Sequence, residues 1–203
     1  MKKYFLLLII IAYTTGCKKS NDQGPAPDYS NSYLPLNTGE TRSYIHNGDN
    51  SERIVSKATG DLHFQDNLMF YGVTYGTGET YYCQSGHSYY MIFSPEFGND
   101  FTIPILDDSE PAGYSSATFP STTNSLDKEP VETELTIIET GISRKINGTT
   151  YKDVVHTSVE IRHPDNESEN SIIYDFYFSK GIGLIEIDKT NNEVIYDILT
   201  LAH

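Results

Sequence analysis

The sequence predicts an all-β domain built from an antiparallel sheet, and three observations support this prediction. Apolar and polar residues alternate in several segments, no segment after residue 17 shows a helical period of useful length, and Gly, Pro, Asn and Asp recur between the alternating segments as turn signals. Strands buried on both faces would instead read as continuous apolar runs. We therefore expect a sheet with one dry face and one wet face.

The alternation is clearest in the C-terminal half. Segment 131–137 places Glu132, Glu134 and Thr136 on one face and the following residues on the other: Val131, Thr133, Leu135 and Ile137. After a turn at Asn147-Gly148, a second segment is expected to have this dry face: Asp153, Val155, Thr157, Val159 and Ile161.

Three further strands are expected in this half, at 173–179, 184–188 and 194–201. Gly181 and Gly183 lie between the first two of these strands. Glycine permits the bend that a strand makes at the corner of a barrel.

The N-terminal half predicts strands at these ranges: 41–46, 53–64, 68–75, 80–84, 88–93 and 101–106. Residues 107–130 contain three prolines among serines and threonines, and we expect them to form a long loop. Loops of that length inside a compact domain are often functional, and a lid over a binding site is one such role.

The first sixteen residues are typical of an export signal. Lys2 and Lys3 precede an apolar run from Phe5 to Ala12, and small residues lead to Cys17. The run is much shorter than the ~20 residues that span a bilayer. Because a cysteine follows Gly16, the segment resembles a bacterial lipoprotein signal, in which the cysteine is lipidated. We expect a signal peptide at 1–16, the lipidated Cys17 and a flexible tether at 17–33, and a single β-domain at 34–203.

The lipid anchor predicts a place in the cell envelope. The tether is rich in Lys, Ser, Asn, Asp, Gly and Pro, which do not form a packed core. Lys18 and Lys19 follow the cysteine where some surface-export signals carry an acidic cluster. This favours an outer-membrane anchor facing the periplasm over display on the cell surface.

The net charge of −14 limits the partners. An acidic excess of this size repels phosphate backbones, so we expect no nucleic-acid binding. It also disfavours docking onto anionic lipid, so attachment to the membrane depends on acyl chains, each worth ~0.8 kcal/mol per buried methylene.

The two cysteines predict no internal disulfide, because lipidation of Cys17 leaves Cys83 without a partner. Cys83 follows two tyrosines in a predicted strand, with no helix start or basic neighbour to lower its pKa. A buried structural thiol is therefore favoured over a nucleophile.

No metal site is predicted. The six histidines never occur as H-x-H or H-x-x-x-H, and zinc would need other ligands nearby. Asp165, Glu167 and Glu169 offer oxygen atoms to calcium, but they lack the spacing of an EF-hand loop. A solvated acidic turn is the favoured interpretation.

The sequence contains no motif that specifies a reaction. No helix follows Gly181-Ile182-Gly183, which a dinucleotide site requires, and the G-x-S-x-G elbow of hydrolases is missing. Paired carboxylates of a glycoside hydrolase stay open, since a sequence does not show how far apart two carboxylates lie. We expect no catalytic residue, no cofactor and no enzymatic activity.

Tyrosines are concentrated in the N-terminal half and allow two interpretations. Tyrosine suits a half-buried pleated surface, with the ring packed and the hydroxyl wet. The alternative is an aromatic platform for a sugar or an extended ligand, for which the candidates are Tyr71, Tyr75, Tyr82, Tyr89 and Tyr90.

Three segments resemble uncharacterised lipoproteins of Gram-negative bacteria. Pro35, Leu36, Gly39 and Tyr44 match a P-L-x-x-G-x-x-W-x-Y block, with Arg42 at the tryptophan position. Segments 151–156 and 174–185 are similar to their Y-x-D-V-x and Y-Y-F-A-x-G-V-G-L-I-K blocks, with Glu186 at the final lysine. This resemblance implies an antiparallel sheet curled into a half-barrel, and no established activity.

The sequence therefore predicts a non-catalytic envelope lipoprotein that binds an apolar or glycan ligand in the concavity of its sheet. The alternative is a structural subunit that docks on an outer-membrane complex through a sheet edge, such as the strand ending at Leu201. A binding protein needs a cavity of a few hundred Å³ with aromatic walls. A docking subunit needs a filled interior and an exposed apolar patch or free edge.

Overall fold

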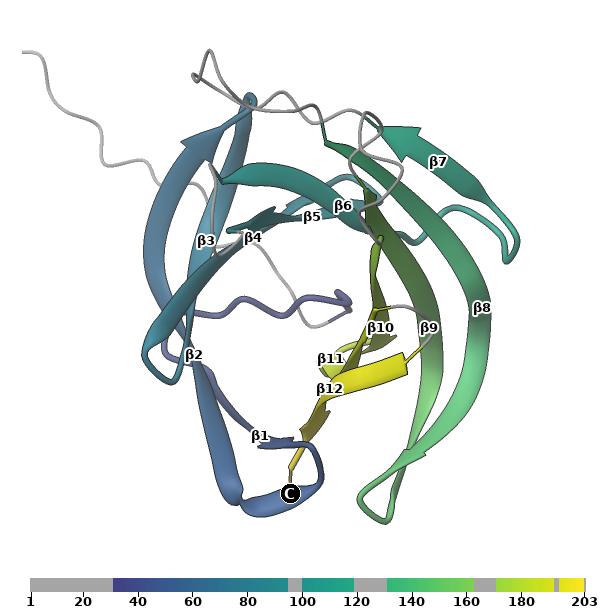
Figure 1. The fold of residues 1–203 in the computed structure, drawn as a ribbon. Helices are drawn as coiled ribbons and strands as arrows, with labels where there is room; N and C mark the ends of the chain where they lie inside the picture. Colours follow the sequence, from purple (N-terminus) through teal and green to yellow (C-terminus); the bar gives the residue numbers. More distant parts are fainter. Residues whose placement is uncertain (1–30, 95–99, 119–130, 163–170, 192–193, 203) are drawn as a thin grey trace, which may run out of the picture.

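The computed structural model describes residues 31–94, 100–118, 131–162, 171–191 and 194–202. These residues form strands and contain no helix, which confirms the predicted all-β class (Figure 1). The strands are β1 (Thr41–His46), β2 (Asp49–Gln65), β3 (Leu68–Tyr75), β4 (Gly78–Ser85), β5 (Ser88–Phe93), β6 (Phe101–Asp107), β7 (Ser115–Thr118), β8 (Glu132–Ile146), β9 (Thr149–Arg162), β10 (Ile172–Ser179), β11 (Gly183–Asn191) and β12 (Val194–Leu201).

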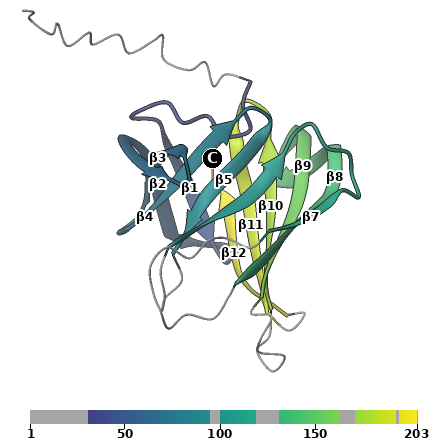
Figure 2. The same cartoon turned by 90° about the horizontal axis from the view of Figure 1, so that it is seen from above.

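The strands form one antiparallel sheet in the order β6-β5-β4-β3-β2-β1-β12-β11-β10-β9-β8-β7. The first and last strands pair in its middle, with Tyr44 opposite Leu201. The two edges are β6 and β7, which are consecutive in the chain. The sheet curls around a central core and is not closed by pairing between β6 and β7, as the predicted half-barrel requires (Figures 1 and 2).

The β6 edge is held against the concave side of the other half of the sheet. Thr157 of β9 donates a buried hydrogen bond of 2.7 Å to the carbonyl of Ile105, and β6 packs on β8 and β9. Farther along, Ile137 donates to the carbonyl of Tyr114 at 2.9 Å, which extends the β7–β8 ladder. The two edges therefore overlap instead of joining, and we call this overlap the seam.

The main core lies on the concave face. Val131, Leu135 and Ile137 are buried there as predicted, and so are Thr133 and Thr157. Alternation therefore gave the correct dry face for β8 and for most of β9.

The N-terminal segment enters one mouth of the curled sheet, where Leu34 and Leu36 join the core (Figure 1). Ser32 and Tyr33, which the sequence assigned to the tether, are buried as well. The carbonyl of Ser32 accepts a hydrogen bond from the Gly181 amide at 2.9 Å, and its hydroxyl donates to Gln84 at 2.7 Å. The packed domain thus includes these two residues.

Two expectations about the strands are wrong. Asp153 is exposed, with φ of 50°, and Val154 is buried beside Val155. The β8–β9 register shifts three times between Ile137 and Arg144, and such irregularities move side chains from one face to the other. The segment 107–130, predicted to be a loop, contains strand β7. The prediction missed this strand because four residues are too few to show an alternating period. Residues 119–130, and with them most of the suggested lid, lie outside the described residues.

Gly183 explains how the N-terminal segment fits. Its φ is 101°, and a β-carbon there would lie 3.0 Å from Cδ of Pro35 and 3.3 Å from the guanidinium of Arg42. Any side chain would therefore strain the backbone and displace the segment. Arg42 lies half-buried in this corner, where it pairs with Glu40.

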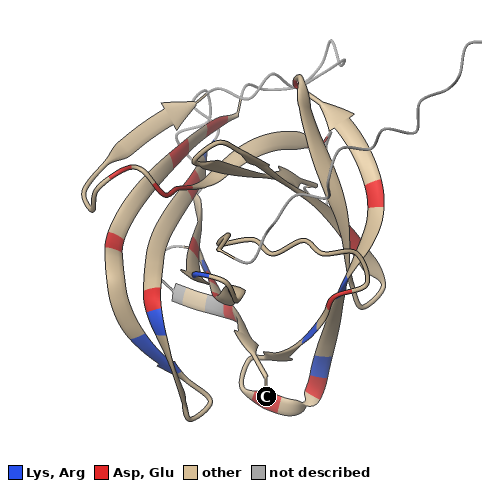
Figure 3. Ribbon diagram, turned by 180° about the vertical axis from the view of Figure 1, so that it is seen from behind, with Lys and Arg blue, Asp and Glu red and all other residues tan. Residues whose placement is uncertain are grey.

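Most of the described charged residues are exposed or half-buried. Acidic residues are spread over many strands (Figure 3). Among the described charged residues, Glu186 and Asp188 of β11 are buried. Cys83 is also buried, as predicted, and burial raises the pKa of its thiol, which disfavours a reactive thiolate.

Candidate functional site

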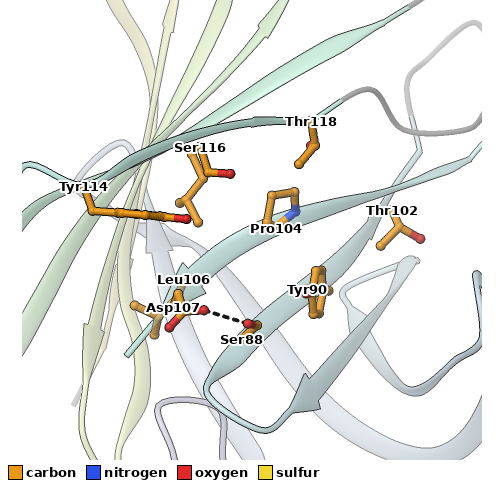
Figure 4. Close-up of a pocket in the computed structure, with 10 residues that line it drawn as sticks. Ser88, Tyr90, Thr102, Pro104, Leu106, Asp107, Tyr114, Ser116 and Thr118 are labelled. Atoms are coloured by element: carbon orange, nitrogen blue, oxygen red, sulfur yellow. Dashed lines mark hydrogen bonds between the residues drawn. The ribbon is translucent and has the colours of Figure 1, made fainter. Parts of the chain in front are cut away.

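A cavity of about 270 Å³ lies at the seam, between the outer side of β5–β6 and the overhanging strand β7 (Figure 4). We call it the seam cleft. Its lining residues are Ser88, Tyr90, Thr102, Pro104, Leu106, Asp107, Tyr114, Ser116, Thr118 and Leu135. The volume is slightly below the ~300 Å³ at which pockets for drug-sized ligands begin, so it suits a small ligand.

Strand alternation places the floor of the cleft. Phe101 and Ile103 of β6 point into the core, so the intervening Thr102 and Pro104 point outward. Pro104 cannot donate a ladder hydrogen bond, which an edge strand tolerates better than a central one.

The wall of the cleft comes from β7, which pairs with β8. Ser116 lies opposite Leu135 and Thr118 opposite Thr133, so these side chains share one face. The hydroxyls of Thr118 and Thr133 lie 2.7 Å apart and are hydrogen-bonded. Figure 4 shows Ser116 and Thr118 directed toward Pro104 across the cleft.

The lining is rich in hydroxyl groups. Six of the ten residues carry one: Ser88, Tyr90, Thr102, Tyr114, Ser116 and Thr118. Two of these are aromatic, and Pro104, Leu106 and Leu135 add apolar surface. Such a surface offers hydrogen bonds in several directions beside flat rings.

Asp107 provides the one carboxylate among the lining residues. Its Oδ2 accepts from the Ser88 hydroxyl at 2.7 Å, and its Oδ1 accepts from the amide and hydroxyl of Ser109 at 3.1 and 2.6 Å. Burial alone would raise the pKa of this carboxyl, but the hydrogen bonds from Ser109 and Ser88 outweigh it and lower the pKa. Asp107 is therefore ionised at neutral pH.

The structure divides the five predicted tyrosines between the two faces of the sheet. Tyr82 and Tyr89 are buried, and Tyr71 and Tyr75 pack partly against the core. The hydroxyls of Tyr75 and Tyr82 lie 3.1 Å apart, and Tyr89 donates to Asp108 at 3.1 Å. Burial is the main cause that raises the pKa of Tyr89 to about 12.

Tyr90 differs from the other four, because it points outward and lines the seam cleft. Its place after the buried Tyr89 is what alternation would indicate once the face of Tyr89 is known. Tyr114 and the hydroxyls of β7 were missed, since they lie in the segment read as a loop, and no sequence signal marks them.

The concave interior offers little space at the N-terminal segment. A cavity of about 20 Å³ remains there, beneath Leu34 and Leu36 and against Tyr44, Val73 and Tyr82. That volume admits about one water molecule. The predicted ligand site in the concavity of the sheet is occupied here by core side chains. The seam cleft is therefore the better candidate for a binding site.

The predicted docking edge at Leu201 is wrong. Strand β12 pairs with β1 on one side and β11 on the other, and Leu201 is buried. The free edges belong to β6 and β7. Exposed apolar side chains do occur on the β2–β3 hairpin, where Leu62, Phe64 and Met69 are 50 to 68% exposed.

Other predicted features lie outside the described residues, namely Cys17 and the acidic turn of Asp165, Glu167 and Glu169. Within the described ranges, no group of three or more His, Cys, Asp or Glu side chains is placed to hold a metal ion. The same ranges contain no helix long and apolar enough to cross a membrane.

No protein-family model matches the sequence, and no curated protein matches it. Among solved structures, the chain is similar to the crystal structure of a "putative lipoprotein" from Parabacteroides distasonis ATCC 8503, determined at 2.70 Å. The two chains are 13% identical, and the match covers 83% of this chain and 96% of the other, with a TM-score of 0.46. This degree of likeness says nothing about a ligand or a partner.

Proposed function

We propose that this protein is a non-catalytic lipoprotein of the bacterial outer membrane that binds a glycan in the seam cleft. The observation that carries the proposal is the cleft itself, a cavity of about 270 Å³ with two tyrosine rings and six hydroxyl groups. The cavity has the aromatic wall expected of a binding protein, and its volume suits a small ligand.

A glycan fits this lining better than an acyl chain. A sugar ring presents hydroxyls that exchange hydrogen bonds with Ser, Thr and Tyr, and apolar ring faces that pack on aromatic side chains. The hydroxyls of Ser88, Thr102 and Thr118 already have partners within the protein. An acyl chain would offer no hydrogen bond to those of Tyr90, Tyr114 and Ser116, which costs roughly 1 to 3 kcal/mol for each group that becomes buried.

The anchor is supported by the signal-like residues 1–16 and by Cys17. The tether then holds the domain near the membrane, and Lys18 and Lys19 favour the periplasmic side. Mass spectrometry of the detergent-extracted protein tests the anchor. We expect a chain that begins at Cys17 and carries fatty acids, whereas a chain with its leader and no fatty acid would contradict this part of the proposal.

Glycan binding is tested by substitution of Tyr90. Calorimetric titration with a panel of oligosaccharides should identify a ligand, and Tyr90→Ala should weaken its binding about tenfold, or ~1.4 kcal/mol. Tyr81→Ala is the matched control, because Tyr81 and Tyr90 pack against the same cluster, but Tyr81 does not line the cleft. Equal losses in both variants would show that Tyr90 acts through stability alone.

A second candidate function is a docking subunit of an outer-membrane complex. Leu62 and Phe64 are two residues apart on β2, and Met69 lies directly opposite Phe64, so the three share one exposed face. Chemical cross-linking in cells tests this candidate. Phe64→Ser should abolish a specific cross-link if this face docks, and an unchanged pattern would exclude docking through it.

A further inference from the structure

Among the residues that line the seam cleft, the charge is of one sign. Asp107 lines it, and none of the ten lining residues is Lys, Arg or His. The neighbouring Asp108 lies outside the lining, where its Oδ1 is 2.6 Å from Nδ1 of His87. An anion entering the cleft would meet a carboxylate and no lining cation.

The arginine at the end of β9 does not change this balance. Arg162 donates to Glu132 at 3.0 Å, to Glu160 at 3.2 Å and to Glu134 at 3.3 Å. Three carboxylates therefore surround one guanidinium, and these groups are half-exposed on the ladder outside the cleft lining. Their combined charge is negative, which adds to the acidic field of the whole chain.

Asp107 has room for one more donor. A carboxylate accepts at about four positions, two on each oxygen. Ser109 donates twice to Oδ1 and Ser88 donates once to Oδ2. A hydroxyl of a ligand in the cleft can donate to the remaining position on Oδ2, and the serines hold the carboxylate in place for it.

Resting on the proposed function, we propose that the seam cleft selects uncharged sugars, which donate a hydroxyl to Asp107, and rejects acidic sugars such as uronates. The selection has an attractive part, the fixed acceptor, and a repulsive part, the like charge. Repulsion between two carboxylates in a partly enclosed site is stronger than in water, because the surrounding dielectric constant is lower.

Titration of the wild-type protein with neutral and uronate-containing oligosaccharides of equal length tests the selection. We expect the acidic series to bind at least about tenfold more weakly at low ionic strength. The gap should narrow as salt is raised to about 0.15 M, where the screening length is ~8 Å. Equal binding of both series would overturn this inference and leave the proposed function standing. If neither series binds, the proposed function fails, and the inference fails with it.

Asp107→Asn identifies the source of the selection. The substitution keeps the shape and removes the charge, so acidic sugars should gain about tenfold in affinity relative to neutral ones. Glu79→Gln is the control, because it changes the net charge equally at an exposed position outside the cleft lining. An equal gain with the control would overturn the assignment to Asp107. If Asp107→Asn does not fold, the ratio of neutral to acidic binding in the wild type still decides whether the cleft selects uncharged sugars.

Discussion

The two longest hairpins of the sheet, β2–β3 and β8–β9, are built on the same plan but are held down by different forces. Each hairpin bends at a register shift, after Ala58 in β2 and after Ile137 in β8. The tip of the first reaches β6, where Gln65 donates to Thr102 at 3.3 Å. The tip of the second reaches β12, where Asn147 donates to the carbonyl of Leu201 at 3.0 Å. Each tip thus contacts the sixth strand of its own half.

The first hairpin covers an apolar cluster on the face opposite the main core. Phe70, Cys83 and Ile92 are at most 3% exposed there, with Tyr81 and Tyr90 packed around them. Burial of apolar surface is non-directional and depends little on pH or salt.

The second hairpin adds an ionic cluster to its apolar contacts. The guanidinium of Arg144 lies 3.5 Å above the ring of Tyr177 and pairs with Glu186. His156 stacks on Tyr177 at 4.2 Å, with its Nε2 3.1 Å from Asp175. Two groups so close to one ring occupy its opposite faces. One fold plan is thus stabilised in two ways, and we expect only the second hairpin to respond strongly to pH.

The largest expected effect is the loss of Phe70. Its side chain belongs to the first hairpin and is fully buried in the cluster with Cys83 and Ile92, so Phe70→Ala should lower the free energy of unfolding by about 3 to 5 kcal/mol. Urea unfolding measures the loss, which should be the same at pH 5 and pH 8. Phe64→Ala, at a residue 68% exposed on the same hairpin, should cost within about 0.5 kcal/mol. Similar costs for the two variants would mean that the hairpin is not held by this cluster.

A smaller loss is expected from Arg144. Arg144→Ala removes the stacking on Tyr177 and leaves the nearly buried carboxylate of Glu186 without its cation. We expect the free energy of unfolding to fall by about 2 to 3 kcal/mol. The loss is smaller than for a fully buried pair because Arg144 is 30% exposed. Arg144→Lys keeps the charge and loses the planar contact, so it should recover only part of the loss. Full recovery with lysine would show that the charge alone matters. Hydrogen exchange should show faster opening of residues 142–151 in both variants.

The smallest effect is a gain, from Asp188. Burial and, after it, the charge of Glu186 raise the pKa of the Asp188 carboxyl from 3.8 to about 6, and its Oδ1 has no hydrogen-bond partner among the described residues. Because the folded state holds this proton more tightly than the unfolded chain, the ionised carboxyl destabilises the fold. Its contribution is most favourable below about pH 4 and is lost as the pH rises to about 6.

Asp188→Asn should therefore stabilise the protein by about 1 to 2 kcal/mol at pH 8 and by almost nothing at pH 4. The value is below the full effect of the pKa shift, because the replacing amide also needs partners. Urea unfolding measures the difference in the free energy of unfolding between variant and wild type. This difference isolates the Asp188 carboxyl, because the other groups titrate in both proteins. A gain that does not depend on pH would contradict the assignment to Asp188.

The strands could be predicted from the sequence where one face is dry. Thr133 to Ile137 in β8 and Val155 to Ile161 in β9 alternate because the period of a strand is two, and this period is a local property. The prediction failed at Asp153 and at β7. A register shift is set by the partner strand, and a strand of four residues shows too little of its period to be recognised.

The candidate site could be predicted only in part, since Tyr90 is the single residue of the five tyrosines that lines the cleft. A tyrosine in an alternating strand faces either the core or the solvent, and the neighbours that decide this come from other strands. Tyr89 faces inward and contacts Tyr33, which is distant in the sequence. Because side chains alternate along a strand, Tyr90 then faces outward.

The sequence by itself determined the class of fold and the turn at Asn147-Gly148, because these depend on residue types within a few positions of one another. The tertiary structure alone decided which strands became edges, where the hairpins bend and where a cavity remains. Those features depend on contacts between strands that are distant in the chain. Contacts between residues some fifty positions apart, such as Ile105 and Thr157, leave no period in the sequence.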